Sequence, residues 1–182
     1  MKIYTKMGDR GETGIIGSER LAKSDVRICA IGAVDEANAI IGWVGTAMDH
    51  RYESNDLLKL IPKVQSALFE VGADLASPND TRFKFSGQSL VAILEESIDQ
   101  MNLELASLVN FVLPGGSEVA SRFHMARGAV RRAEREVSLL NEHFSVNSTV
   151  QIFINRLSDW LFVAARYANH IEEIDDVKWS QS

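Results

Sequence analysis

The chain has 182 residues, of which 46% are hydrophobic and 24% charged, a composition typical of one globular domain and not of a disordered segment. Its formal net charge of −6 argues against a non-specific nucleic-acid binder, and its single cysteine, Cys29, excludes an intrachain disulfide and a thiolate zinc site. The sequence starts without a signal-like apolar stretch and has no run near the roughly 18 apolar residues of a membrane span. We therefore expect a cytoplasmic protein that binds neither membrane nor nucleic acid.

The first 24 residues predict an irregular arm, with a weak strand pattern only at Lys2–Thr5. Residues 5–17 carry glycine at every third position. Glycines let backbone N–H groups turn towards an anion, while Lys6 supplies charge and Thr5 or Thr13 a hydroxyl. These features suit a polyphosphate. Neither the Walker A pattern nor the Rossmann pattern occurs, and a flexible terminus is the alternative interpretation.

Five stretches show the apolar spacing of helices. They are Asp25–His50, Asn55–Ala76, Gln88–Leu108, Glu118–His143 and Ser148–Ile171. Pro62 predicts a kink in the second helix or a later start, and Ser117 is the predicted N-cap of the fourth. The fold class is therefore all-α: a five-helix bundle with an irregular N-terminal nucleotide-binding arm. We expect one domain over 1–182, with the arm at 1–24, the bundle at 25–171 and a tail at 172–182.

The first helix is apolar around much of its circumference, and Asp35 interrupts it. Gly32, Gly42 and Gly45 are poor helix formers, each costing about 1 kcal/mol relative to alanine. Such glycines predict that another backbone or a ligand comes close. A carboxylate at a packed interface needs a cationic partner; the alternative is an Asp35 that faces water.

The fourth helix carries a basic stripe, which we define as Arg127, Arg131, Arg132 and Arg135, with Glu134 as its local acid. A solvated helix face with i,i+4 pairs is the usual explanation for such a run. Four arginines with one local acid repel one another unless an outside anion neutralises them. A triphosphate or an acidic partner surface would do so, and the guanidinium fork suits bidentate phosphate contacts.

Five ordered motifs together resemble one family, the PduO-type ATP:cob(I)alamin adenosyltransferases. They are YTKMGDRG at 4–11, VDE at 34–36, FVLPGGS at 111–117, AR at 126–127 with RRAER at 131–135, and NRLSD at 155–159. The resemblance runs from Met1 to about Asn169. It implies a five-helix bundle that assembles as a homotrimer, with active sites at the subunit interfaces.

The resemblance also assigns expected roles to residues. Its ATP-binding positions are Thr5, Lys6, Met7, Gly8, Thr13, Gly14 and Lys23 in the arm, and Arg131, Arg132, Ala133, Glu134, Arg135 and Asn155 from the neighbouring subunit. It implies an intersubunit salt bridge between Asp35 and Arg127, and cobalamin contacts at Asp35 and Phe111. Arg131, Asp35, Arg127 and Phe111 are the expected catalytic residues. Met7 stands where the family commonly has threonine, which predicts weaker ATP binding if that hydroxyl contacts a phosphate.

The implied reaction is attack of cobalt(I) on the 5′ carbon of ATP, giving adenosylcobalamin and triphosphate. Mg²⁺ is an expected companion of the phosphates, with no ligand residues identified, and a reductase and a cobalamin-dependent acceptor enzyme are expected partners. Two alternatives are a phosphotransferase or phosphohydrolase using the same elements, and a non-catalytic helical module that binds an acidic partner. For Phe111, the alternative is a residue that plugs the end of the bundle.

Overall fold

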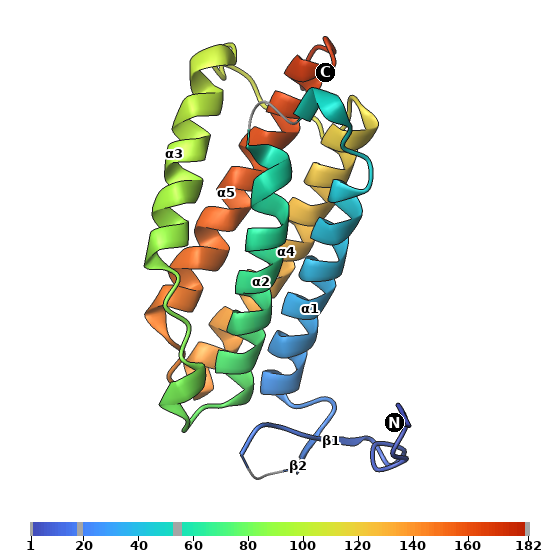
Figure 1. The fold of residues 1–182 in the computed structure, drawn as a ribbon, viewed down its shortest axis with the longest axis vertical. Helices are drawn as coiled ribbons and strands as arrows, with labels where there is room; N and C mark the ends of the chain where they lie inside the picture. Colours follow the sequence, from blue (N-terminus) through green and yellow to red (C-terminus); the bar gives the residue numbers. More distant parts are fainter. Residues whose placement is uncertain (1, 18–19, 53–55, 181–182) are drawn as a thin grey trace.

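A computed structural model describes residues 2–17, 20–52 and 56–180 as a bundle of five long helices (Figure 1). The helices are α1 (Val26–Gly45), α2 (Leu57–Ala76), α3 (Gln88–Glu104), α4 (Glu118–His143) and α5 (Ser148–Ile171). Single 3-10 turns, η1 (His50–Tyr52) and η2 (Thr81–Phe83), follow α1 and α2. An antiparallel hairpin of β1 (Glu12–Gly14) and β2 (Arg20–Ala22) precedes the bundle. The all-α prediction is confirmed.

The predicted helices match the observed ones best where capping residues mark the ends. Ser117 caps α4 as predicted, since its hydroxyl accepts the N–H of Ala120 over 3.0 Å. The predicted α4 and α5 have the observed bounds. The predictions for α1 and α3 ran too long, since α1 ends at Gly45 and the chain takes an extended conformation at Leu105 after α3.

One further prediction of secondary structure was wrong, and one of the two alternatives given for Pro62 is excluded. Residues 2–5 form no strand; the strands lie further along, at β1 and β2. Pro62 does not mark a later helix start, since α2 begins at Leu57 and continues through it. The proline removes only the one backbone hydrogen bond that its own N–H would have made within the helix.

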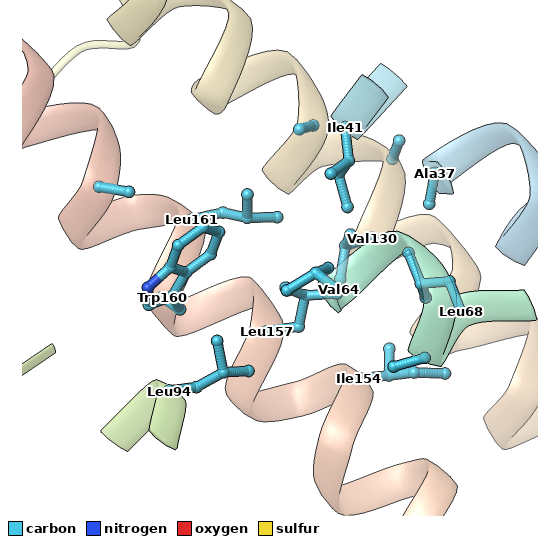
Figure 2. Close-up of a cluster of buried hydrophobic side chains, with 14 of the residues drawn as sticks. Ala37, Ile41, Val64, Leu68, Leu94, Val130, Ile154, Leu157, Trp160 and Leu161 are labelled. Atoms are coloured by element: carbon cyan, nitrogen blue, oxygen red, sulfur yellow. The ribbon is translucent and has the colours of Figure 1, made fainter. Parts of the chain in front are cut away.

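The core runs the length of the bundle and receives side chains from all five helices (Figure 2). Trp160 of α5 is fully buried, packs edge-on against Phe123 with ring centroids 5.9 Å apart, and donates its indole N–H to Ser97. Helix α5 packs against both α3 and α4. Within the described residues, α1 is the one helix long and apolar enough to span a membrane, and it packs here against α2 and α4.

Helix α2 approaches α1 closely at two of the three glycines. A Cβ on Gly42 would lie 2.7 Å from the Gln65 amide nitrogen, and one on Gly45 would lie 3.3 Å from Ile61. The sequence analysis expected another backbone or a ligand at these positions, whereas the close neighbours within this chain are side chains of α2. Gly32 differs, because nothing lies within 4 Å of the place where its Cβ would be. It opens into a groove described below.

Candidate active site

The N-terminal arm folds into a compact turn that holds Lys23 over Gly8. The Lys23 N–H donates to the Gly11 carbonyl over 2.8 Å, and Gly11 in turn donates to the Gly8 carbonyl. A Cβ on Gly8 would lie 3.4 Å from the Lys23 ammonium nitrogen, so the lysine side chain lies in contact range of Gly8. Two sequence-predicted residues, 15 positions apart, are thus brought together.

The same turn strains one of its predicted residues. Lys6 has φ of +61°, a left-handed conformation that is uncommon outside glycine and asparagine and that concentrates at functional sites. Thr5, Lys6 and Met7 are exposed, Thr13 is half-buried and Gly14 is exposed. Arg20, which the sequence analysis did not single out, donates to the Met7 carbonyl and pairs with Glu12. The arm thus presents its backbone and Lys6 outward.

The arginines of the basic stripe on α4 differ in whether they pair with an acid of the same chain. Arg132 pairs with Glu36 on α1, and the only local acid, Glu134, accepts a hydrogen bond from Asn155 of α5 over 2.8 Å. Arg131 and Arg135 are exposed. Among the described residues neither forms an ion pair, and Arg135 donates only to the Arg131 carbonyl. Two guanidinium groups are therefore exposed without an ion pair to any described residue.

Ala133 has a different place from its neighbours in the stripe. Its side chain is 1% exposed and belongs to the core cluster. The residue therefore has no side-chain surface to offer a ligand. Because Ala133 packs in the core, the neighbouring residues of the basic stripe lie on the outer side of α4.

Arg127 and Asp35 do not meet within one chain. The Arg127 guanidinium lies 5.6 Å from the ring centroid of Phe162 on α5, and its buried Nε has no hydrogen-bond partner in the part of the chain that the structure describes. Burial lowers the pKa of Arg127, and the charge of Arg131 lowers it further. A buried donor without an acceptor is costly, so this arginine lacks a partner.

Asp35 lies instead in an apolar groove between α1 and α2. The groove has a volume of about 450 Å³, and Ile31, Gly32 and Phe69 are among its lining residues. Phe69 is 70% exposed. Asp35 is exposed and forms no ion pair with any described residue. The carboxylate is thus set in an uncovered apolar surface, which is an unusual place for a charge in an isolated subunit.

Phe111 belongs to the loop before α4. This loop lies at the end of the bundle opposite the arm (Figure 1). The Phe111 side chain is 79% exposed, so within this chain it does not plug the bundle, and that alternative is wrong. The 26 residues of α4 correspond to about 39 Å of helix, and this sets the separation between the two ends. The arm and Phe111 of one chain therefore cannot serve the same small site.

His124 is a buried polar residue that the sequence analysis did not assign. It is 6% exposed, its ring lies 6.3 Å from Phe162, and neither ring nitrogen has a partner among the described residues. Burial lowers its pKa, and Arg127 lowers it further while Asp176 opposes the shift. In the sequence, the feature that could have drawn attention to His124 is its position one helical turn before Arg127.

The described residues contain no group of three or more histidine, cysteine, aspartate or glutamate side chains that would hold a metal ion. The sequence analysis expected Mg²⁺ as a companion of the phosphates, with no ligand residue identified. No residue of this chain is assigned to it.

Comparison with known proteins agrees with this geometry. The family model described as cobalamin adenosyltransferase matches residues 3–168. The corrinoid adenosyltransferase of Bacillus subtilis is 39% identical over 183 residues, covering 100% of this chain and 94% of that protein. The human corrinoid adenosyltransferase is 35% identical over 173 residues, covering 92% of this chain and 68% of that protein.

Solved structures show the same likeness in three dimensions. A variant of the PduO-type ATP:corrinoid adenosyltransferase from Lactobacillus reuteri, complexed with cobalamin and ATP, superposes with a TM-score of 0.94 at 41% identity. The match covers 99% of this chain and 100% of that one. A second variant of that enzyme, complexed with ATP, gives a TM-score of 0.92 at 42% identity, covering 98% and 100%. The chain therefore belongs to the cobalamin adenosyltransferase family and is an enzyme of that class.

Proposed function

We propose that this chain transfers the 5′-deoxyadenosyl group of ATP to the cobalt of cob(I)alamin, at a site shared by two copies of the chain in a homotrimer. Cobalt(I) donates its electron pair to the 5′ carbon, the carbon–oxygen bond breaks, and triphosphate leaves with that bond's electrons. Since the nucleophile belongs to the substrate, the protein must position the reactants and stabilise the leaving charge. Family membership decides against a phosphotransferase or a non-catalytic module.

The observation that carries the proposal is the pair of exposed arginines, Arg131 and Arg135, whose local acid is held by Asn155. Negative charge collects on the triphosphate as the bond to carbon breaks. Guanidinium groups already in place lower the free energy of that state more than that of bound ATP. Asn155 and Glu134 complete the nucleotide contacts on this side of the proposed site.

The arm supplies the other half of the proposed ATP site. Lys23 brings its ammonium group to the turn around Gly8, and Lys6 adds an exposed ammonium group from the same arm. The exposed residues Thr5, Lys6 and Met7 offer backbone N–H donors. Thr13 and Gly14 on β1 line the same arm. Mg²⁺, when bound with ATP, would neutralise part of the phosphate charge. At Met7 the carbonyl is engaged by Arg20, and the thioether offers no hydroxyl to a phosphate.

Two observations support the proposed shared site. They are the distance between the two ends of the bundle, and two charged groups that have no charged partner within the described chain. Reacting atoms must approach to about 3–3.5 Å, whereas the arm and Phe111 of one chain lie at opposite ends of the bundle. Asp35 and Arg127 each lack a charged partner within the described chain. A neighbouring copy that brings Arg127 onto the groove around Asp35 would satisfy both, and it would cover Phe69.

Phe111 is proposed to lie beneath the corrin. An exposed ring there keeps water and the cofactor's own base from the lower face of cobalt, which makes cobalt(II) easier to reduce. A one-electron reductase and a cobalamin-dependent acceptor enzyme are the proposed partners, and the cytoplasm is the proposed location. We also propose a single domain, with arm, bundle and tail at 1–24, 25–171 and 172–182.

The test is to mix the purified protein with ATP and chemically reduced cobalamin and follow the absorption spectrum. The proposal expects adenosylcobalamin to form with one triphosphate per turnover. Release of ADP or pyrophosphate without a new corrinoid spectrum would overturn it. Light scattering on the same sample should give three times the chain mass, and a concentration-independent monomer would overturn the shared site.

A further inference from the structure

The C-terminal tail reaches the loop that carries Phe111 and pairs with it. The Trp179 N–H donates to the Phe111 carbonyl over 2.8 Å, and the Leu113 N–H donates to the Val177 carbonyl over the same distance. Between them, Val112 and Lys178 form an antiparallel bridge. In this register Phe111 stands directly opposite Trp179, and such cross-strand aromatic pairs stabilise each other's placement.

The two rings make the contact that this register predicts. Their centroids lie 6.2 Å apart at an interplanar angle of 79°, an edge-to-face arrangement favoured by the charge distribution of aromatic rings. Phe111 stays 79% exposed and Trp179 45% exposed in this pair. The contact therefore fixes one side of the Phe111 ring and leaves most of its surface free.

Buried polar contacts anchor the tail to α5. Asp176 accepts from the Arg166 Nε over 2.7 Å, and the two side chains are 17% and 7% exposed. Arg166 also donates to the Ala106 carbonyl over 2.8 Å, so one guanidinium holds both the tail and the loop before α4. Buried ion pairs are costly to break. The tail is thus fixed before Trp179 is reached.

A second residue of α5 ties the tail to the start of α4. Asn169 is 1% exposed, accepts the Ser117 N–H over 2.9 Å and donates to the Gly115 carbonyl and to Asp176. Gly116 has φ of +105°, and a Cβ there would lie 2.2 Å from the Asn169 side-chain oxygen. Loop, tail and the N-cap of α4 therefore share one support.

We propose that Trp179 is a positioning residue for Phe111: the anchored tail holds the Phe111 ring in the one orientation that covers the lower corrin face. A solitary exposed ring changes rotamer in picoseconds to nanoseconds, and a ring that samples several rotamers leaves the lower face open for part of the time. Trp179 acts on the reaction only through Phe111. This inference rests on the proposed role of Phe111.

The test compares Trp179→Ala and Trp179→Phe with the unchanged protein. Activity is measured from cob(II)alamin with a mild reductant and, separately, from pre-reduced cob(I)alamin. We expect Trp179→Ala to lose roughly two- to ten-fold more activity from cobalt(II) than from cobalt(I), the range that one aromatic pair allows. Trp179→Phe, which keeps a ring, should restore most of it. Phe83→Ala, an exposed aromatic at the opposite end, is the matched control.

A spectroscopic reading separates positioning from folding. The four-coordinate fraction of bound cob(II)alamin should fall in Trp179→Ala and return in Trp179→Phe, with trimer mass and thermal midpoint unchanged. In a Phe111→Ala background, Trp179→Ala should have no further effect. Equal losses from both cobalt states, or losses that add to those of Phe111→Ala, would overturn the inference.

The two proposals fail in different ways. If Phe111→Ala shows no preference for the cobalt(II) reaction, the proposed role of Phe111 is wrong. If Phe111→Ala shows that preference while Trp179→Ala behaves like the unchanged protein, the role of Phe111 stands and only the positioning role of Trp179 is wrong.

Discussion

Asn155 on α5 donates a hydrogen bond to Glu134 on α4 over 2.8 Å, and so holds the one acid of the basic stripe away from Arg131 and Arg135. Released from that contact, Glu134 would be free to pair with Arg131, three positions before it, since i,i+3 neighbours on a helix attract. The hydrogen bond therefore keeps positive charge available for an outside anion.

Arg131→Ala should lower kcat/KM by roughly 10- to 150-fold, the equivalent of about 1.5–3 kcal/mol for a hydrogen bond to a charged group. The loss should fall mainly on kcat if the arginine acts on the departing triphosphate. Steady-state kinetics and a thermal melt measure both quantities. Arg82→Ala, another exposed arginine, serves as the control. Normal kinetics in a well-folded variant would show that the basic stripe is an ordinary solvated helix face.

Asn155→Ala should weaken ATP binding, because it removes a proposed nucleotide contact and frees Glu134 to pair with the arginines. We expect KM for ATP to rise several-fold, and the double variant Asn155→Ala/Glu134→Gln to recover part of that loss. Titration of ATP binding by calorimetry checks the direction. If Glu134→Gln gives no recovery, Glu134 does not compete for the arginines.

Asp35→Asn and Arg127→Lys should each impair trimer formation or cobalamin turnover. If the two groups pair across the interface, their effects will not add, and the coupling energy should be about 0.5–3 kcal/mol. The double variant should then cost less than the sum of the single ones. Sedimentation over a concentration series measures assembly, and strict additivity in both assembly and turnover would show that the two residues do not interact.

His124 should make the protein less stable in acid. Burial and Arg127 lower its folded pKa, whereas in the unfolded chain the pKa is about 6.5. As the pH falls through this range, the unfolded state therefore binds more protons than the folded state does. The free energy of unfolding is therefore unaffected by the titration of His124 above about pH 7.5. Below the unfolded pKa it falls by up to about 1.4 kcal/mol per pH unit.

The measurement is the thermal midpoint at fixed protein concentration between pH 7.5 and pH 5.5. His124→Leu should flatten this dependence, whatever it does to stability at pH 7.5. His143→Leu, at an exposed position on the same helix, should leave the slope unchanged. A slope that His124→Leu does not alter would show that other groups cause the acid sensitivity.

The helical architecture could be predicted because local signals agree with it. Ser117 marks the start of α4, and the three-and-four spacing of apolar residues in α4 continues to its end. The ends of α1 and α3 were harder to predict, since no proline or cap residue stops the apolar pattern there. The hairpin was missed because its strands have only three residues each, too few for an alternating pattern to stand out.

For the site, the sequence indicated the kinds of residues but not their pairings. The lone acid in the stripe was visible, yet only the structure shows that Asn155, 21 residues away, holds it. Trp179 gave no signal at all, because its neighbour Phe111 lies 68 positions earlier and the two meet through backbone pairing. Such contacts depend on how the packed helices bring distant segments of the chain together, and no local sequence pattern predicts that.

The placement of the arm and Phe111 at opposite ends of the bundle has a consequence for mixtures of defective chains. If each site takes its arm from one copy and its basic stripe from the next, a chain with Lys6→Ala and a chain with Arg131→Ala are damaged in different halves of the site. Trimers reassembled from equal amounts of both would contain intact halves facing each other at about a quarter of their interfaces. Two inactive proteins would complement one another.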